Sequence, residues 1–321
     1  MELSAGARDR AAGVLLGQAI GDALGVPYEF AAPVKAGEAR MIGGGLGPYA
    51  PGEWSDDTQM ALCIAQVAAA GADLTTDDAL DAVAEAFIGW KGHGASDIGR
   101  QTATVLARAS ARDAGTRLSH RMTAVSMELA QDGRAGNGGL MRTAIVGLSA
   151  LDSAEQTALA AARVSALTHA EARCVDSCVL WSLAVRNAVL TAALDLRGGL
   201  AYLPAERRGR WEEWIAEAET KDPSTFTPNG YTVTALQAAW SAIVATQTVA
   251  GPDHVSAALH LAISIGDDTD TVAAIAGGLL GARWGAERLP REWVDQVHGW
   301  PGLNAADLTR LGLAVAGTPL A

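Results

Sequence analysis

Small and aliphatic residues recur along most of this chain with the spacing of an α-helix, and this periodicity limits the possible folds more than any other feature. Apolar residues that repeat every three or four positions lie on one face of a helix. Turn signals such as Gly71, Pro223 and the Gly251-Pro252 pair separate the periodic segments. The expected helices are Arg8–Leu24, Thr58–Ala70, Thr76–Lys91, Ile98–Ser110, Leu140–Ala150, Ser153–Ser165, Glu171–Leu194, Arg207–Thr220, Tyr231–Thr246, His254–Ser264 and Thr271–Trp284.

Composition agrees with a helical interior. Hydrophobic residues make up 49% of the 321 residues, but aromatic residues only 5%, which favours helices rich in Ala, Leu and Val over a β-sandwich. Alternating polar and apolar runs, which indicate strands, are scarce. Because the sequence has no tandem repeat and no long linker, we expect a single all-α domain over residues 1–321.

Charge and cysteine usage exclude several classes of protein. The formal charge of −12 argues against a broad basic face for nucleic acid. The N-terminus carries charges where a secretory signal has its apolar run, and Arg186 interrupts the longest apolar stretch, so we expect no membrane association. Cys63, Cys174 and Cys178 lie in apolar, helical surroundings and are expected to be buried free thiols. These features predict a cytoplasmic protein.

Acidic residues concentrate in two short segments that are far apart in the sequence. Trp54-Ser55-Asp56-Asp57-Thr58 and Gly266-Asp267-Asp268-Thr269-Asp270-Thr271 each stand directly before an expected helix. Helix capping is one interpretation, since Ser, Thr and Asp are favoured at helix starts. One cap requires one side chain, however, whereas the two segments together offer five carboxylates and three Thr hydroxyls.

If the two acidic segments meet in the folded chain, bound cations are needed between them. Carboxylates about 4 Å apart repel each other by about 4 kcal/mol at an effective dielectric of 20. A donor set made only of oxygen atoms selects hard ions such as Mg²⁺ or Mn²⁺ over Zn²⁺. Two helix starts that each supply two or three oxygen atoms could therefore form a site for two metal ions.

Five motifs follow one another along nearly the whole chain. They are Gly21-Asp22-Ala23-Leu24-Gly25 with Tyr28-Glu29-Phe30, then Ser55-Asp56-Asp57-Thr58, Gly136-Asn137-Gly138-Gly139-Leu140-Met141-Arg142, Thr168-His169-Ala170, and Gly266-Asp267-Asp268-Thr269-Asp270-Thr271. In this order they resemble the ADP-ribosylglycohydrolase family. The resemblance implies a single orthogonal helical bundle. It also implies a metal-dependent hydrolase that releases ADP-ribose from an ADP-ribosylated protein or another ADP-ribosyl conjugate.

The same resemblance implies a centre with two divalent cations, Mg²⁺ being favoured and Mn²⁺ the alternative. Asp267 stands where many relatives have glycine, and we expect it to be a solvated or capping acid. Asp22 is expected to cap a turn or to support the residues around the metals. The implied ligands are Ser55, Asp56, Asp57, Asp268, Asp270 and Thr271.

Glu29 matches a family glutamate that lies beside the metals, and the resemblance implies a catalytic role as a base or as an acid for the leaving group. The alternative is an exposed acid without a role. Glu29 precedes residues 31–54, which hold six glycines and three prolines. An irregular segment of this length is usually functional or disordered. A functional segment could close over the substrate and carry Glu29 with it.

The resemblance also implies a binding site for ADP-ribose. The glycine-rich turn at residues 136–139 precedes the expected helix Leu140–Ala150, whose first amides would favour a diphosphate. His169 corresponds to a histidine that contacts the phosphates. Tyr231 corresponds to an aromatic residue that stacks on adenine, although a tyrosine in the core is the competing interpretation. The implied substrate-binding residues are Asn137, Gly138, Gly139, Met141, His169 and Tyr231.

The acceptor linkage remains open at the level of sequence. Relatives that cleave arginine linkages often carry an acid shortly before the glycine-rich motif, and the nearest one here is Asp132. Arginine is slightly favoured over serine, and another ADP-ribosyl conjugate is a further alternative. A module that binds ADP-ribose without turnover is the alternative to an enzyme. We expect a monomer.

Overall fold

The computed structural model describes residues 2–112, 115–249 and 251–317, and it confirms an all-α fold. Beside the helices, the described chain forms one antiparallel pair of short strands, β1 (His298–Gly299) and β2 (Leu303–Asn304). The α-helices are α1 (Ala5–Gly25), α2 (Asp56–Ala69), α3 (Asp77–His93), α4 (Arg100–Ser110), α5 (Leu118–Gln131), α6 (Ala154–Ala166), α7 (Ala172–Thr191), α8 (Ala205–Thr220), α9 (Thr232–Ala245), α10 (Pro252–Ser264), α11 (Thr269–Trp284), α12 (Arg291–Val294) and α13 (Ala305–Val315). The 3-10 helices are η1 (Val26–Tyr28), η2 (Asn137–Arg142), η3 (Ala144–Leu148), η4 (Arg197–Tyr202), η5 (Pro223–Thr225) and η6 (Ala286–Arg288).

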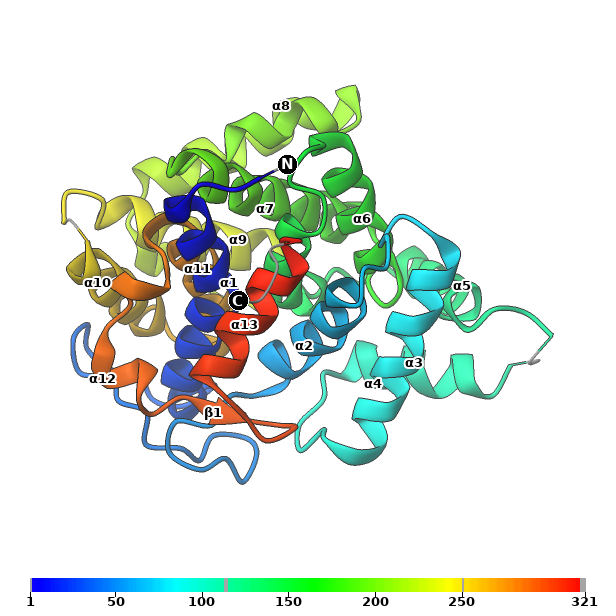
Figure 1. Ribbon diagram of the computed structural model, residues 1–321, viewed down its shortest axis with the longest axis horizontal. Helices are drawn as coiled ribbons and strands as arrows, with labels where there is room; N and C mark the ends of the chain where they lie inside the picture. The colour runs from blue at the N-terminus through cyan, green and yellow to red at the C-terminus, as the bar shows by residue number, and fades with distance from the viewer. Residues whose placement is uncertain (1, 113–114, 250, 318–321) are drawn as a thin grey trace.

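Helices α1 and α11 pack against each other at the centre of the bundle (Figure 1). Their backbones touch because small residues face each other: a Cβ atom added at Gly17 would overlap the carbonyl oxygen of Gly277, and one at Gly21 would overlap that of Ala273. This pairing runs the two helices antiparallel. The end of α1 therefore lies beside the start of α11, where the second acidic segment is found.

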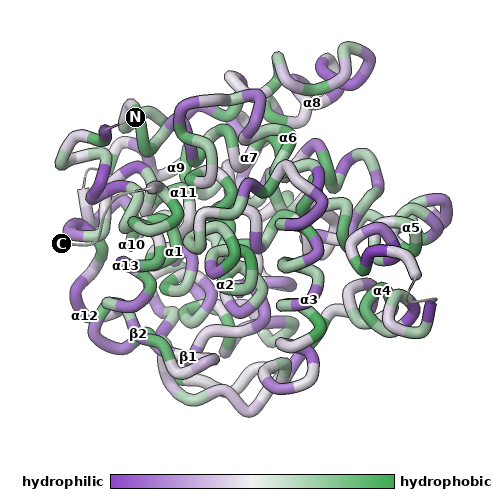
Figure 2. The backbone as a smooth tube through the Cα atoms, turned by 45° about the vertical axis from the view of Figure 1, so that its right-hand side comes forward, coloured by the Kyte–Doolittle hydropathy of each residue, from purple (hydrophilic) through white to green (hydrophobic). Residues whose placement is uncertain are grey.

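The remaining helices surround this pair. Helix α13 packs on α1, α7 and α9 pack on α11, and α3, α4 and α5 form a flank at one side (Figure 1). Hydrophobic segments gather in the interior and hydrophilic ones recur along α8 and the outer loops (Figure 2). The cysteines at positions 63, 174 and 178 are buried and unpaired, as expected.

The prediction of a helix over Leu140–Ala150 is wrong. The chain forms two short 3-10 helices there, η2 and η3, which are separated at Thr143. The glycines of the preceding turn supply no side chain to start a regular helix, and the carbonyl of Thr143 accepts a hydrogen bond from Ser182 Oγ on α7. Packing against α7 therefore decides the local conformation over propensity.

Two longer helices of the described chain, α5 and α13, were not predicted from the sequence. Helix α5 begins without a side-chain cap, so its start carries no sequence signal. Helix α13 does carry one, because Asn304 and Asp307 form a capping box at its start. The expected helix boundaries elsewhere agree with the observed ones to within a few residues.

The prediction that Arg186 makes the longest apolar stretch too polar for a membrane span is wrong for helix α7. By length and composition it is apolar enough to cross a membrane. In the folded chain, however, 72% of its most apolar window is buried inside the protein, and it packs on α6, α9 and α11. This is the environment of a core helix.

Candidate active site

The two acidic segments meet, as the sequence analysis predicted. Oxygen atoms of Asp22, Asp57 and Asp270 all lie within 4.8 Å of one another, and so do oxygen atoms of Glu29, Asp268 and Asp270. Asp270 belongs to both groups. The start of α2, the start of α11 and the end of α1 thus bring together carboxylates from opposite ends of the chain.

Asp22 on α1 caps the start of α2 from outside that helix. Its Oδ1 accepts hydrogen bonds from the backbone N–H and the hydroxyl of Ser55, both at 2.8 Å. Its Oδ2 accepts from the backbone N–H of Thr58 at 3.0 Å and from its hydroxyl at 2.6 Å. The expectation that Asp22 caps a turn is confirmed, and Ser55 makes no capping bond of its own.

At the start of α11, too, the residue in the N-cap position makes no capping bond with its side chain. Asp268 occupies the N-cap position but its side chain caps no backbone amide. Its Oδ2 instead accepts a hydrogen bond of 2.7 Å from Asn137 Nδ2 in the glycine-rich turn. Capping therefore does not explain why Asp57 and Asp268 stand at these helix starts.

Burial makes this cluster unfavourable for a chain without bound ions. Asp57 and Asp270 are 1% and 3% exposed. Desolvation raises the pKa of both carboxyls well above the usual range, and neighbouring carboxylates raise it further. Desolvation also raises the pKa of Asp22 to about 6, although its hydrogen bonds from Ser55 and Thr58 oppose the shift. A positive charge between the acids would reverse these effects.

The donors of the cluster fit a hard divalent cation. Asp57 Oδ1 is buried and has no hydrogen-bond partner among the residues that the structure describes. The Ser55 hydroxyl lies 3.1 Å from Asp57 Oδ2 and 3.4 Å from Asp270 Oδ2, yet it has one proton and Asp22 is nearer. Buried carboxylate oxygens that lack partners are the ligands that Mg²⁺ and Mn²⁺ prefer.

The other predicted ligands, Thr271 and Asp56, differ in their burial. Thr271 is buried beside Asp57 and Asp268 and lowers the pKa of both carboxyls, which partly opposes the effect of burial. Asp56, in the first turn of α2, is partly exposed. Burial raises its pKa well above the usual range, and Asp97 adds to the shift. Asp56 belongs to neither of the two carboxylate groups.

Two acids that the sequence analysis left in doubt lie outside both carboxylate groups. Asp267 adopts a positive φ of 60°, and its carboxylate accepts a hydrogen bond from the Thr227 hydroxyl. Asp132 is exposed at the C-terminal end of α5. Neither belongs to the carboxylate groups described above.

Glu29 follows η1 and stands just before residues 31–54, the glycine-rich segment. The next residue ties this point to the acidic cluster, because the Phe30 backbone N–H donates to the carbonyl of Asp267 at 2.7 Å. Glu29 is partly exposed. Burial, together with the charges of Asp268 and Asp97, raises the pKa of its carboxyl to about 8.

The glycine-rich turn packs directly against His169. A Cβ atom added at Gly138 would lie 2.9 Å from His169 Cε1, so only glycine fits without displacing the ring. Gly139 and Met141 are buried in η2. Because η2 itself begins at Asn137, the expected helix start after the turn is absent, and the helix-dipole argument for diphosphate binding does not apply here.

Tyr231 adjoins the same turn rather than lying in the core. Its backbone pairs with Gly136 in an isolated antiparallel bridge, and its ring is partly exposed. The Arg173 guanidinium lies 5.5 Å from the ring centroid and donates to the Tyr231 hydroxyl at 3.0 Å. His169 and Tyr231 thus both adjoin the turn, and Asn137 joins the turn to Asp268 in the acidic cluster.

Sequence reasoning missed the residue that joins these motifs. Asn229 is completely buried, and its Oδ1 accepts the backbone N–H of Asp268 at 2.9 Å while its Nδ2 donates to the carbonyl of Gly266. Its own carbonyl accepts from Asn137 Nδ2. A lone Asn in a polar connection carries no signal of this role. Asp97, a partly exposed acid between α3 and α4, was missed for the same reason.

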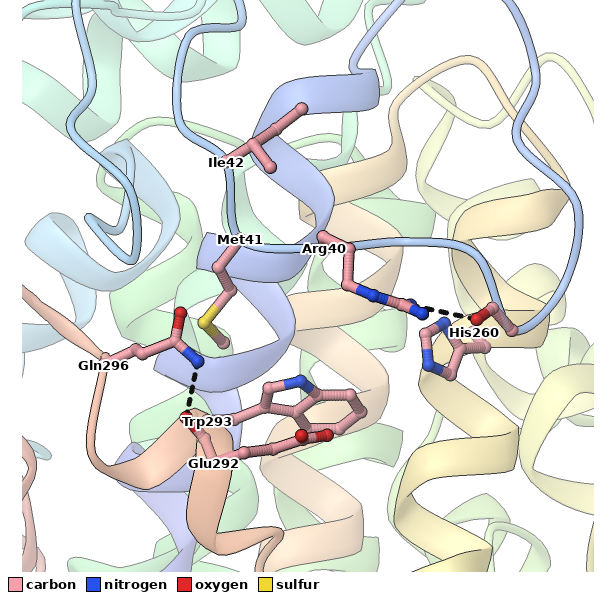
Figure 3. A pocket seen from close by; sticks show the side chains of 8 residues that line it. Arg40, Met41, Ile42, His260, Glu292, Trp293 and Gln296 are labelled. Carbon is pink, nitrogen blue, oxygen red and sulfur yellow. Dashed lines mark hydrogen bonds between the residues drawn. The ribbon is translucent and has the colours of Figure 1, made fainter.

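A cavity of about 300 Å³ lies elsewhere, between the glycine-rich segment, α10 and α12 (Figure 3). Arg40, His260, Trp293 and Gln296 are among its lining residues. None of the predicted site residues lines it. The candidate site is therefore defined by its chemistry rather than by cavity size.

Comparison with known proteins identifies the family to which the chain is similar. The family model for ADP-ribosylglycohydrolase matches residues 3–318. The chain is 33% identical over 304 residues to ADP-ribosylarginine hydrolase Tri1 of Pseudomonas putida, covering 91% of this chain and 75% of that protein. It is 26% identical over 301 residues to ADP-ribosyl-[dinitrogen reductase] glycohydrolase of Rhodospirillum rubrum, covering 90% of each.

A solved structure shares the fold. A chain of an "ADP-ribosylglycohydrolase-related protein complex" superposes with a TM-score of 0.74 at 24% identity, covering 98% of this chain and 99% of that one. The helical bundle and the family match together define the class: this chain belongs to the ADP-ribosylglycohydrolase family. It is an enzyme of the ADP-ribosyl glycohydrolase type.

Proposed function

We propose that this enzyme is a metal-dependent hydrolase that releases ADP-ribose from ADP-ribosylated arginine side chains. The observation that carries the proposal is the pair of carboxylate groups that share Asp270. Two carboxylate groups that share one aspartate would suit two neighbouring divalent cations. Two ions held in this way form the kind of site that clamps vicinal oxygen atoms of a substrate.

The chain's own residues divide into two sets around this site. Asp57, Asp270 and Ser55 would hold one ion, and Asp268, with Asp270 and Thr271, the other, while the partly exposed Asp56 would be a further ligand. When bound, Mg²⁺ or Mn²⁺ would supply Lewis-acid polarisation of substrate oxygen atoms. Asp22 is engaged by four hydrogen bonds from Ser55 and Thr58, which suits a supporting role.

Glu29 is the residue best placed for proton transfer. Its partly exposed carboxyl adjoins Asp268 and Asp270, and its pKa of about 8 keeps it protonated near neutral pH in the absence of cations. Bound cations would lower that pKa toward the range in which the carboxylate accepts a proton. Glu29 can therefore change protonation state during a reaction at neutral pH.

ADP-ribose would extend from the acidic cluster toward the glycine-rich turn. Asn137 bridges the two regions through its hydrogen bond to Asp268. Gly138 is partly exposed next to His169, whereas Gly139 and Met141 are buried in the same 3-10 helix. The Tyr231 ring, which is partly exposed beside the turn, offers a face for adenine.

Two observations favour arginine over serine as the acceptor. The relative with 33% identity is named an ADP-ribosylarginine hydrolase. In addition, Glu29, Asp56 and Asp97 are partly exposed acids near one another, since the charge of Asp97 raises the pKa of both Glu29 and Asp56. Negative charge of this kind attracts a cationic guanidinium more strongly than a neutral serine hydroxyl.

The decisive experiment measures ADP-ribose release from arginine-linked and serine-linked substrates, with EDTA, Mg²⁺ or Mn²⁺. We expect release from the arginine linkage only with a divalent cation. Asp57→Ala and Asp270→Ala should each lower kcat/KM by at least about a hundredfold, because the ions lose a ligand. Asp253→Ala, which removes an exposed acid of α10, is the matched control and should match the wild-type rate.

Three outcomes would contradict the proposal at different points. Full activity in EDTA would exclude the role of metal ions. Faster release from serine would reverse the assignment of the acceptor. Tight binding of ADP-ribose with no turnover of either substrate would favour a binding module over a hydrolase.

A further inference from the structure

Three side chains behind the glycine-rich turn form a buried chain of hydrogen bonds. Arg142 Nη2 donates to Thr168 Oγ1 at 2.7 Å, and Thr168 Oγ1 lies 2.8 Å from His169 Nδ1. Arg142 and Thr168 are completely buried, and His169 is 3% exposed. The chain runs from the core at Arg142 to the turn at His169.

The donors and acceptors along this chain determine the position of the histidine proton. Arg142 has only donors, so Thr168 Oγ1 accepts from it. The single hydroxyl proton of Thr168 then has one acceptor in reach, His169 Nδ1, and a neutral ring that accepts at Nδ1 carries its proton on Nε2. The opposite tautomer would leave a buried hydroxyl proton without an acceptor, which is costly.

The other edge of the imidazole faces the turn. A Cβ atom added at Gly138 would lie 3.1 Å from His169 Nε2, and one at Gly136 would lie 3.7 Å from it. Nε2 has no hydrogen-bond partner in the part of the chain that the structure describes. The Nε2 edge of the ring therefore faces the glycines of the turn.

Arg142 is an unusual residue to find at the base of this chain. Among the described residues it has no carboxylate partner at ion-pair distance, and its guanidinium lies 4.6 Å from the centroid of the Phe87 ring. Its Nε is buried and has no hydrogen-bond partner within the described part of the chain. A buried cation that lacks a counter-ion is costly, which calls for a reason other than stability. Burial and the nearby charge of Arg142 lower the pKa of His169 to about 3, so the ring stays neutral.

We propose that Arg142 and Thr168 are positioning residues that hold His169 in its Nε2–H tautomer and so present a fixed donor to the diphosphate of ADP-ribose. This inference rests on the proposed function, because it takes ADP-ribose as the ligand. The opposite tautomer would present a lone pair to phosphate oxygens and would repel them. A donor fixed before binding also reduces the ordering that binding requires.

The test compares Thr168→Val, which removes the hydroxyl and keeps the shape, with Thr168→Ser, which keeps the hydroxyl. The tautomer of His169 is read from ¹H–¹⁵N spectra of ligand-free protein labelled at histidine, and the His169→Gln spectrum identifies the signal. Binding of ADP-ribose is measured by calorimetry. We expect the Nε2–H tautomer in wild type and Thr168→Ser. In Thr168→Val we expect a mixture of tautomers and affinity weakened about tenfold or more.

Each readout can overturn the inference separately. An Nδ1–H tautomer in the wild-type protein would refute it without any variant, so a Thr168→Val chain that fails to fold would not block the test. Unchanged tautomer and affinity in a folded Thr168→Val protein would also refute it. A wild-type protein that shows the Nε2–H tautomer but does not bind ADP-ribose would refute the proposed function, while the hydrogen-bond chain itself would stand.

Discussion

Two acids at this site have roles that differ from those that their positions in the sequence indicate. Asp22 lies near the C-terminal end of α1, where an acid is unfavourable for the helix dipole, but it caps α2 instead. Asp268 occupies a cap position and caps nothing. The carboxylates of Asp57 and Asp268 make no capping bond and are therefore available to bind a cation.

Asp22→Ala tests this division of labour. Four hydrogen bonds to Ser55 and Thr58 are lost at a buried position, so we expect the free energy of unfolding to fall by about 2 kcal/mol or more. Activity should fall as well, since Asp57 lies in the first turn of the same helix. Asn304→Ala, which removes the cap of α13 and none of the hydrogen bonds of the acidic cluster, should cost about 1 kcal/mol and leave activity unchanged. Urea unfolding and ADP-ribose release provide the two measurements, and equal activity in both variants would contradict the expectation.

Glu29→Gln separates proton transfer from metal binding. If Glu29 transfers a proton, kcat should fall about a hundredfold or more, while the stabilisation by Mg²⁺ stays close to wild type. Glu38→Gln, an exposed acid of the same segment, is the control. The two quantities are measured by steady-state kinetics and by thermal unfolding with and without Mg²⁺. Wild-type kcat in Glu29→Gln would remove this residue from the mechanism.

At the scale of elements, the contact between α1 and α11 places the site. The glycines of α1 recur every fourth position at 13, 17, 21 and 25 and let the two backbones touch. That contact sets the end of α1, with Asp22, beside the start of α11, with Asp270. A pair of helices held farther apart would separate these two carboxylates.

Gly21→Ala should therefore destabilise the protein, although alanine is the better helix former. The added methyl group overlaps the carbonyl of Ala273, so the helices must move apart, at a cost of about 1–3 kcal/mol. Gly89→Ala in α3, where a Cβ atom meets nothing within 4 Å, should instead stabilise by about 0.5–1 kcal/mol. Chemical denaturation of both variants checks the opposite signs, and a stable Gly21→Ala protein would show that the contact is not as tight as described.

At the scale of the whole molecule, the fold confines negative charge that it cannot neutralise by itself. Burial raises the pKa of Asp22 to about 6 and that of Glu29 to about 8. The unfolded chain releases these protons at lower pH than the folded chain does. The stability that the protonated Asp22 and Glu29 contribute is therefore fully present below the ordinary pKa range of carboxyl groups. This contribution is lost as pH rises from about 4 to about 8.

The expected result is a metal-free protein whose Tm is higher at pH 5 than at pH 8. Mg²⁺ should restore the Tm at pH 8 and act less at pH 5, because the ions bind the deprotonated carboxylates. Asp57→Asn removes one buried charge, so it should raise the Tm of the metal-free protein at pH 8 and abolish the gain from Mg²⁺. Thermal unfolding after EDTA treatment measures this, and a Tm independent of both pH and Mg²⁺ would contradict it.

The sequence by itself determined the helical class, the family and the two acidic segments whose carboxylates meet, because periodicity and short motifs are local properties. The spacing of the glycines in α1 and the capping box of α13 were also local signals. Only the tertiary structure decided that Asp22 caps α2, that Asn229 joins the turn to Asp268, and that residues 140–148 form 3-10 helices against α7. Each of these depends on contacts between segments that are distant in the chain, and no local pattern encodes which partner a buried hydrogen-bonding group will find.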